Sequence, residues 1–209
     1  LLLTAAGNKV LLLAQPKPTA VPHHITPTFG STNGGTMVTV WGEAVKKAGM
    51  QHCVFGTSNV KMIISGSVGL CLSPARNLGS VNVFLEGEDS IERAGPTKFQ
   101  FVAEHQVDSM VPTLGKTVGG TIVSILGLNF KNSTSAGCRF GDLFVNSTFV
   151  HSELVVCSTP RHAARFVQVE VTNNGQDFSK GGVRFLYDDA LIESISPLKG
   201  PIFGGTQVH

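Results

Sequence analysis

The sequence PTFGSTNGGT at residues 27–36 returns as PTLGKTVGGT at 112–121 and as PLKGPIFGGT at 197–206. Each copy begins 85 residues after the previous one, which indicates an internal repeat. The glycine pair in each copy predicts a tight structural turn, because glycine adopts positive φ without steric cost. The three pairs are Gly34 and Gly35, Gly119 and Gly120, and Gly204 and Gly205.

A β-branched run follows the first two glycine pairs and predicts a strand in each copy. Val38 and Val40 alternate with Thr39, and residues 122–126 repeat the pattern. Such alternation places one side of a strand in a core and the other in water. About seven short runs of this kind occur in each repeat, and an Asn-Gly pair at 174–175 predicts a tight final hairpin. The sequence therefore predicts an all-β chain of tandem immunoglobulin-like β-sandwiches with little helix.

The repeat predicts two complete modules between two partial ones. We expect module 1 at residues 21–105 and module 2 at residues 106–190. Residues 1–20 would be the C-terminal strands of a preceding repeat, paired as a hairpin, and residues 191–209 the truncated start of a third. That start has too few strands to fold alone, so we expect it to be mobile or to borrow an edge of module 2. The short connection between modules 1 and 2 predicts a semi-rigid rod.

Charge and hydropathy exclude two classes of partner. The formal net charge is +2, and the densest basic cluster is the pair Lys46-Lys47, so no nucleic-acid partner is expected. The two leucine-rich runs before residue 14 are interrupted by Ala, Gly, Asn and Lys, and each is too short to span a bilayer. Membrane attachment is expected only through parts of the protein outside this chain.

Four cysteines fall two in each module, Cys53 with Cys71 and Cys138 with Cys157. Cys53 and Cys138 both stand two residues before a Phe-Gly pair, whereas Cys71 and Cys157 both stand three residues before a proline. Because the fold must bring bonded cysteines within reach of each other, this regularity predicts one disulfide inside each module.

Two N-glycosylation sequons begin at Asn132 and Asn146, in or beside predicted loops of module 2. Together with the paired cysteines, they indicate a secretory, oxidising compartment. We therefore expect an extracellular or cell-surface location.

Several motifs occur in the order found in the IPT/TIG domain, which they resemble. That domain is the immunoglobulin-like module of plexins, of the hepatocyte growth factor receptor group and of some transcription factors. Module 1 departs from the pattern, with Gly42-Glu43-Ala44-Val45 in place of Gly-x-Asn-Phe and a longer, acidic final hairpin. The motifs are Gly127-Leu128-Asn129-Phe130, Cys138-Arg139-Phe140-Gly141, Cys157-Ser158-Thr159-Pro160 and Asn174-Gly175.

This resemblance implies a non-catalytic segment of a cell-surface receptor or adhesion protein. Such a segment acts as a semi-rigid spacer, with a protein ligand or neighbouring IPT/TIG repeats as partners. One alternative is an intracellular module of the transcription-factor kind, which binds DNA backbone or dimerises. Another is an accessory module of a secreted polysaccharide-acting enzyme, although one Trp and one Tyr make an aromatic platform for sugar hard to build.

The sequence predicts neither an enzyme nor a cofactor. It contains no Gly-x-Ser-x-Gly or His-Glu-x-x-His motif, and a strand follows each complete Gly-Gly-Thr turn where a phosphate cradle needs a helix. His23 and His24 are neighbours on a strand and should point to opposite faces, so we expect no shared metal and solvent exposure for both. Asp188-Asp189 is interpreted as a solvated turn rather than a calcium site.

Trp41 and Leu126 occupy equivalent positions at the ends of the two post-glycine strands. Strand parity places both on the outer face, which predicts a possible contact surface between modules or with a partner. The other interpretation is that the loop at 43–50 covers Trp41.

Overall fold

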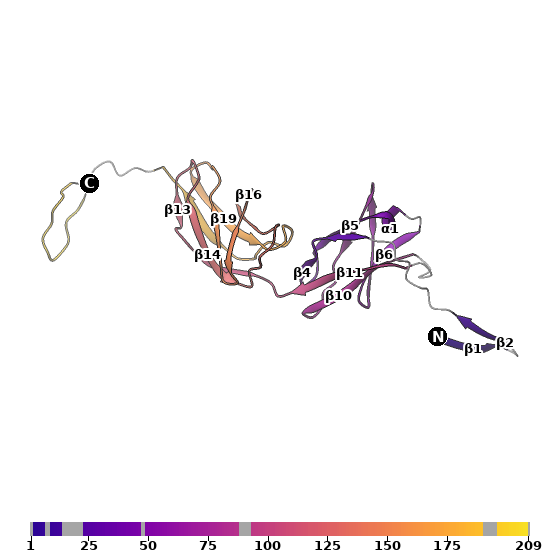
Figure 1. The fold of residues 1–209 in the computed structure, drawn as a ribbon. Helices are drawn as coiled ribbons and strands as arrows, with labels where there is room; N and C mark the ends of the chain where they lie inside the picture. Colours follow the sequence, from indigo (N-terminus) through magenta and orange to yellow (C-terminus); the bar gives the residue numbers. More distant parts are fainter. Residues whose placement is uncertain are drawn as a thin grey trace.

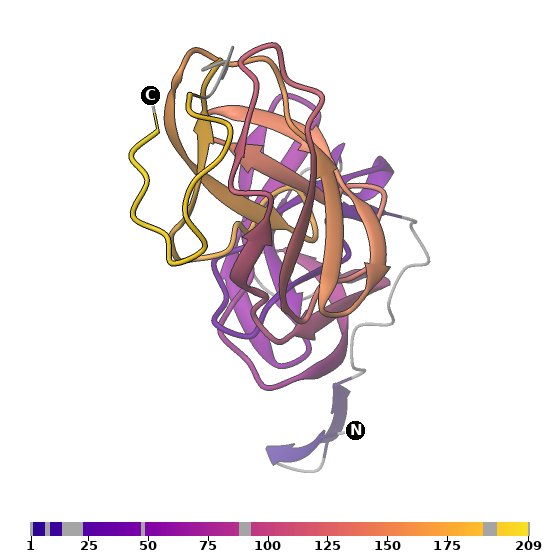
Figure 2. The ribbon, with the colours of Figure 1, turned by 90° about the vertical axis from the view of Figure 1, so that its left-hand side faces the viewer.

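The computed structural model describes residues 2–6, 9–13, 23–46, 49–87, 93–189 and 196–208. Two β-sandwiches follow one another along an elongated molecule (Figure 1), and the view in Figure 2 places module 2 in front of module 1. In the described residues the one helix is the four-residue α1 (Glu43–Lys46). The predicted fold class, tandem immunoglobulin-like sandwiches, is therefore confirmed.

The N-terminal hairpin pairs β1 (Leu2–Ala6) with β2 (Lys9–Leu13) in a two-stranded sheet of its own. The pairing is antiparallel and sets Leu2 opposite Leu13. The predicted hairpin is present, while its assignment to a preceding repeat, like the module boundaries, stays a prediction.

Module 1 is built from two sheets. The first sheet has the order β3 (His24–Thr26), β5 (Met37–Trp41), β9 (Val68–Leu72) and β8 (Ile63–Ser65). The second has the order β4 (Phe29–Ser31), β11 (Arg93–Val102), β10 (Gly79–Gly87), β6 (Met50–Phe55) and β7 (Ser58–Lys61).

Module 2 repeats this arrangement strand for strand. Its first sheet has the order β12 (Gln106–Val111), β14 (Ile122–Leu128), β18 (Leu154–Ser158) and β17 (Thr148–His151). Its second has the order β13 (Leu114–Gly115), β20 (Val183–Tyr187), β19 (Arg165–Thr172), β15 (Gly137–Phe140) and β16 (Leu143–Asn146).

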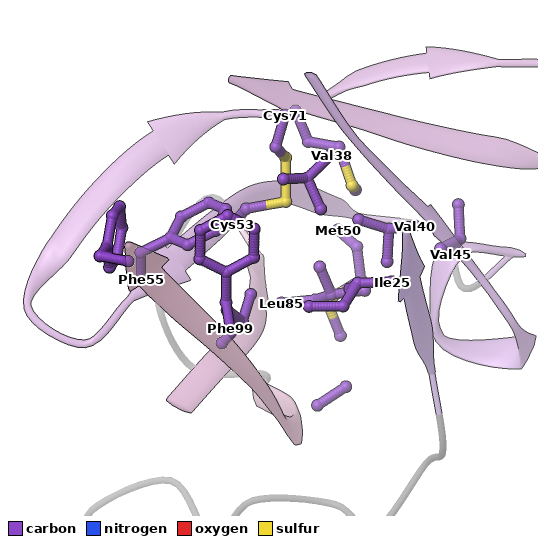
Figure 3. Packing of buried hydrophobic residues seen from close by; sticks show 14 residues of the cluster. Ile25, Val38, Val40, Val45, Met50, Cys53, Phe55, Cys71, Leu85 and Phe99 are labelled. Atoms are coloured by element: carbon purple, nitrogen blue, oxygen red, sulfur yellow. A yellow bond between two sulfur atoms is a disulfide. The ribbon is translucent and has the colours of Figure 1, made fainter. Parts of the chain in front are cut away.

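Each core contains a disulfide between its two sheets. Figure 3 shows the Cys53–Cys71 bond beside Phe55 and Phe99 in module 1. The Cα atoms are 6.4 Å apart in this disulfide and also in Cys138–Cys157 of module 2. Aromatic rings pack next to the disulfide in the core. Phe55 and Phe99 contact each other edge to face, with ring centroids 5.3 Å apart. Each module therefore has a core of its own, cross-linked as the sequence predicts.

The glycine pairs adopt the expected left-handed backbone in all three copies. Gly34 and Gly35 have φ of 73° and 81°, and Gly204 and Gly205 have 78° and 83°. The third copy thus forms the same local turn, although residues 196–208 are exposed and contain no strand. Whether this segment is mobile stays a prediction.

The final hairpin of module 2 turns at the predicted Asn-Gly pair. Thr172 at the end of β19 forms an antiparallel bridge with Phe178, and the N–H of Ser179 donates to the Val171 carbonyl at 2.8 Å. Side-chain oxygens of Thr172 and Asn174 accept N–H groups within this turn, and four further residues lead to β20 at Val183.

Candidate functional site

The joint between the modules brings together distant parts of the sequence. Residues 103–105 connect β11 to β12, and the first glycine turn of module 1 at 29–36 faces two loops of module 2. We call this region the joint and define it by residues 29–36, 100–105, 129–131 and 173–180.

A hydrogen-bonded carboxylate lies at the centre of the joint. The Thr36 hydroxyl, whose residue is fully buried, donates to Asp177 Oδ2 at 2.7 Å. The Asn174 amide donates to the same oxygen at 2.9 Å and to the Phe29 carbonyl of module 1 at 3.1 Å. Hydrogen bonds to an ionised acceptor are stronger than neutral ones, and these bonds link the two modules directly.

The loop that carries Asp177 is held in shape by its own polar groups. Asn174 Oδ1 accepts the N–H groups of Gln176 at 3.0 Å and Asp177 at 2.9 Å. Thr172 Oγ1 accepts the N–H of Gly175 at 3.0 Å, where φ is 74°. Because these bonds are internal to module 2, the carboxylate is positioned before it meets module 1.

The second loop of module 2 binds the connecting segment. Asn129 has φ of 61°, a conformation that asparagine tolerates, and its side chain donates to the Glu104 carbonyl at 2.8 Å. Asn173 joins the two loops, because its amide donates to the Asn129 carbonyl at 2.9 Å. In module 1 the equivalent stretch at 42–45 lacks this asparagine and leads into α1.

Charged side chains surround the buried contacts. Lys180 Nζ lies 3.5 Å from Glu104 Oε1, and the Lys131 ammonium lies 5.4 Å from the centre of the Phe29 ring. A hydrogen bond from the Asn33 side chain, together with Lys180, lowers the pKa of Glu104. Exposed ion pairs contribute little to stability, whereas the Thr36–Asp177 contact is partly buried.

His105 attaches the connecting segment to module 2. Its Nε2 lies 2.8 Å from the Val171 carbonyl oxygen, which only accepts, so Nε2 carries the proton. Burial lowers the pKa of His105 from 6.5 more than the Val171 carbonyl, Asp177 and Glu104 raise it. The neutral ring is therefore the form that fits the joint.

The joint is expected to loosen in acid. The pKa of His105 in the folded protein lies below its ordinary value of 6.5. The stability that the neutral ring contributes is therefore fully present above about pH 6.5, and it is lost as the pH falls through the lower, folded-state pKa. Residual dipolar couplings at about pH 7.5 and about pH 5 should show that the orientations of the modules become less correlated. His105→Gln keeps an N–H donor without titrating in this range, and should abolish the change. An unchanged pH dependence in that variant would assign the effect to other groups.

The cavity at the joint is small. It encloses about 80 Å³ between the modules, well below the roughly 300–1,000 Å³ of small-molecule sites. Among the residues that the structure describes, no three His, Cys, Asp or Glu side chains gather as metal ligands. No helix in that part of the chain is long and apolar enough to cross a membrane.

The predicted contact residues both lie on the surface. Trp41 is 37% exposed and Leu126 43% exposed, so the cover expected from residues 43–50 leaves much of the indole in solvent. The sequon residues Asn132 and Asn146 are exposed as well, and their glycosylation stays a prediction.

The expectation that both adjacent histidines are exposed is wrong for one of them. His23 is buried, and His24 is exposed beside Trp41, with ring centroids 6.4 Å apart. The predicted opposite facing explains this difference, because one side of the strand packs inward, where the His23 ring lies against Gly95.

Sequence reasoning did not identify the joint network. Thr36 was seen only as part of the turn motif, and Asp177 had no assigned role. A usable signal was the Asn-x-x-Asp spacing of Asn174 and Asp177, which positions a carboxylate on a turn. At the other end of module 2, the Asp189 carboxylate accepts hydrogen bonds from the N–H and hydroxyl of Thr117, as a turn residue does.

Comparisons with known proteins agree with the repeat architecture. The IPT/TIG domain model matches residues 20–101 and again residues 106–187. Human fibrocystin-L is 23% identical over 154 residues, which are 72% of this chain and 4% of that protein. An ankyrin and IPT/TIG repeat-containing protein of Schizosaccharomyces pombe is 33% identical over 99 residues, 47% of this chain and 8% of that protein.

The fold is also that of a solved receptor segment. A structure of the full extracellular region of plexin A4 superposes with a TM-score of 0.54 at 19% identity, covering 93% of this chain and 18% of that one. The chain thus spans a small part of each relative's length.

Proposed function

Because the chain belongs to the IPT/TIG domain family, we propose that it is a non-catalytic extracellular segment of a cell-surface receptor or adhesion protein. Within such a protein, its two modules act as one semi-rigid spacer. The observation that carries this proposal is the shared carboxylate of Asp177, which receives Thr36 of module 1 and Asn174 of module 2. The similarity to fibrocystin-L and to the plexin A4 extracellular region supports it.

The short connection and the buried contact both favour rigidity. Three residues between β11 and β12 leave little freedom for the modules to reorient. Separating the modules would exchange the Thr36–Asp177 hydrogen bond for hydration, and a hydrogen bond to a charged group contributes about 1.5–3 kcal/mol net. The modules therefore favour the orientation in which this bond is made.

The two disulfides support an oxidising compartment. Such bonds persist in secreted and extracellular proteins and are rare in the cytosol. Titration of the denatured, unreduced protein from its native source should detect no reactive thiol, while four reactive thiols would favour the intracellular alternative.

Surface residues supply the proposed sites of contact and modification. Trp41 and Leu126 lie on the outer faces of equivalent sheets, where a neighbouring repeat or a protein ligand reaches them. N-linked glycans at Asn132 and Asn146 would be accommodated in solvent, because both residues are exposed.

Removing the Asp177 carboxylate is expected to release the modules from each other. In the unmodified protein, residual dipolar couplings of both modules should fit one alignment tensor. Asp177→Ala should give two tensors of different magnitude, because Thr36 and Asn174 lose their common acceptor. Asp142→Ala removes an exposed carboxylate elsewhere in module 2 and serves as the matched control. Two independent tensors in the unmodified protein would overturn the spacer function.

A further inference from the structure

Two shallow hollows adjoin on one side of the joint. One of about 750 Å³ lies at the end of module 1, another of about 370 Å³ lies across the joint, and both are lined by Leu78. The first is lined by Arg76 and the second by Lys131 and Gln100. We call this surface the Leu78 groove and define it by Arg76, Leu78, Gln100 and Lys131.

The two cations of the Leu78 groove have no carboxylate partner in the part of the chain that the structure describes. Arg76 Nη1 lies 3.3 Å from the Phe55 carbonyl oxygen, and its guanidinium rests on Gly56. Lys131 Nζ lies 3.4 Å from the Gln100 side-chain oxygen. Both positive charges are therefore held in place by neutral groups and remain uncompensated.

Leu78 places an apolar side chain between these charges. It is 68% exposed, so its side chain is available to a partner. The groove is therefore amphipathic, with an apolar centre and positive ends.

The repeat shows that this turn does not require Leu78. The N–H of Arg76 donates to the Thr32 carbonyl at 2.8 Å, as the N–H of His162 donates to the Thr117 carbonyl at 2.9 Å. Module 2 therefore has His162 in the place of Arg76, and two residues later it has an alanine instead of Leu78. The Arg76 guanidinium also lies within 3.5 Å of oxygens of Thr57 and Ser58, so it braces the turn between β6 and β7 while its charge stays next to the groove.

We propose that the Leu78 groove binds an extended acidic segment of a partner protein. Carboxylates of that segment pair with Arg76 and Lys131, and an apolar side chain between them packs on Leu78. Charge complementarity identifies this occupant, and the apolar centre distinguishes it from a sulfated saccharide, which has no use for leucine. The inference rests on the proposed role as an extracellular binding segment and names the chemistry of its ligand.

The test uses the whole chain and a fluorescein-labelled peptide, Glu-Glu-Glu-Leu-Glu-Glu-Glu, followed by fluorescence anisotropy at low salt. Arg76→Glu and Lys131→Glu should each weaken binding about tenfold or more, and Leu78→Ala about threefold. Arg165→Glu makes the same charge change at an exposed position of module 2, at the end of β19 away from the joint, and should stay within about twofold. A peptide with Gln in place of every Glu should not bind.

Other outcomes overturn the proposal. These are no binding by the folded protein, equal weakening by Arg165→Glu, or binding of a sulfated saccharide that is unchanged in Leu78→Ala. A concentration-dependent dimer lost in Arg76→Glu would assign the groove to a second copy instead. If circular dichroism shows that the Arg76→Glu variant is unfolded, the peptide affinity of the Lys131→Glu variant tests the proposal. A negative result leaves the alignment-tensor measurement unaffected, so failure here is distinguishable from failure of the spacer function.

Discussion

Alanine at Gly34 is expected to destabilise module 1 by about 3 kcal/mol or more, whereas alanine at Gly35 should cost only about 1–2 kcal/mol. Both glycines have positive φ, 73° and 81°, so both variants suffer the backbone penalty of a left-handed residue. A Cβ at Gly34 would also lie 2.6 Å from backbone atoms of Pro74 and Ala75, while one at Gly35 meets nothing within 4 Å. The difference between the two variants isolates the steric contact.

The neighbouring backbone leaves no easy relief of that contact. The N–H of Gly35 donates to the Ser73 carbonyl at 2.8 Å, and the N–H of Arg76 donates to the Thr32 carbonyl at 2.8 Å. Moving either segment away would break one of these bonds.

Urea unfolding followed by tryptophan fluorescence measures this effect. Trp41 is the one tryptophan of the chain and lies in module 1, so its signal reports that module. Gly119 and Gly120 provide an independent pair in module 2, where the fluorescence of Tyr187, the one tyrosine of the chain, supplies the signal. A Cβ at Gly119 would lie 2.7 Å from Pro160, whereas one at Gly120 meets nothing within 4 Å. Equal urea midpoints for Gly34→Ala and Gly35→Ala would show that the contact of a Cβ with Pro74 and Ala75 is not the reason why residue 34 is a glycine.

Replacing both Cys53 and Cys71 by alanine should lower the free energy of unfolding of module 1 by about 3 kcal/mol. The disulfide closes a loop with a sequence separation of 18 and joins β6 to β9, which lie in different sheets. Without it the unfolded chain gains conformational freedom, and the core loses a cross-link beside Phe55. The same urea titration, read by Trp41, measures the change.

The second disulfide is the matched control. Cys138 and Cys157 belong to the separate core of module 2, so replacing both by alanine should move the Trp41 transition by less than about 1 kcal/mol. A shift as large as that of the module 1 variant would mean that the two modules unfold as one cooperative unit.

Much of each module could be predicted because its determinants are local or repeated. The alternation of Val38 with Val40 identified a half-buried strand, and the structure buries both residues fully. The spacing of the cysteines identified their pairing, because two copies of one fold must place equivalent atoms in equivalent positions. The Asn-Gly pair at 174–175 identified the turn of the final hairpin, where Thr172 bridges Phe178 and side-chain oxygens of Thr172 and Asn174 accept N–H groups of the turn.

The candidate site was largely beyond such reasoning. Thr36 and Asp177 are 141 residues apart, and nothing in either repeat alone indicates that they meet. Arg76, Leu78 and Lys131 likewise form one groove only because the joint sets module 2 against the end of module 1.

From its own residues the chain specified the repeat, the glycine turns, the strand faces and the disulfides, since each of these depends on φ, side-chain parity or the equivalence of two copies. Folding in three dimensions settled the orientation of the modules, the shared carboxylate of the joint and the charged groove beside it. These features depend on contacts between surfaces of different repeats. Such contacts produce no repeating pattern in the sequence from which they could be predicted.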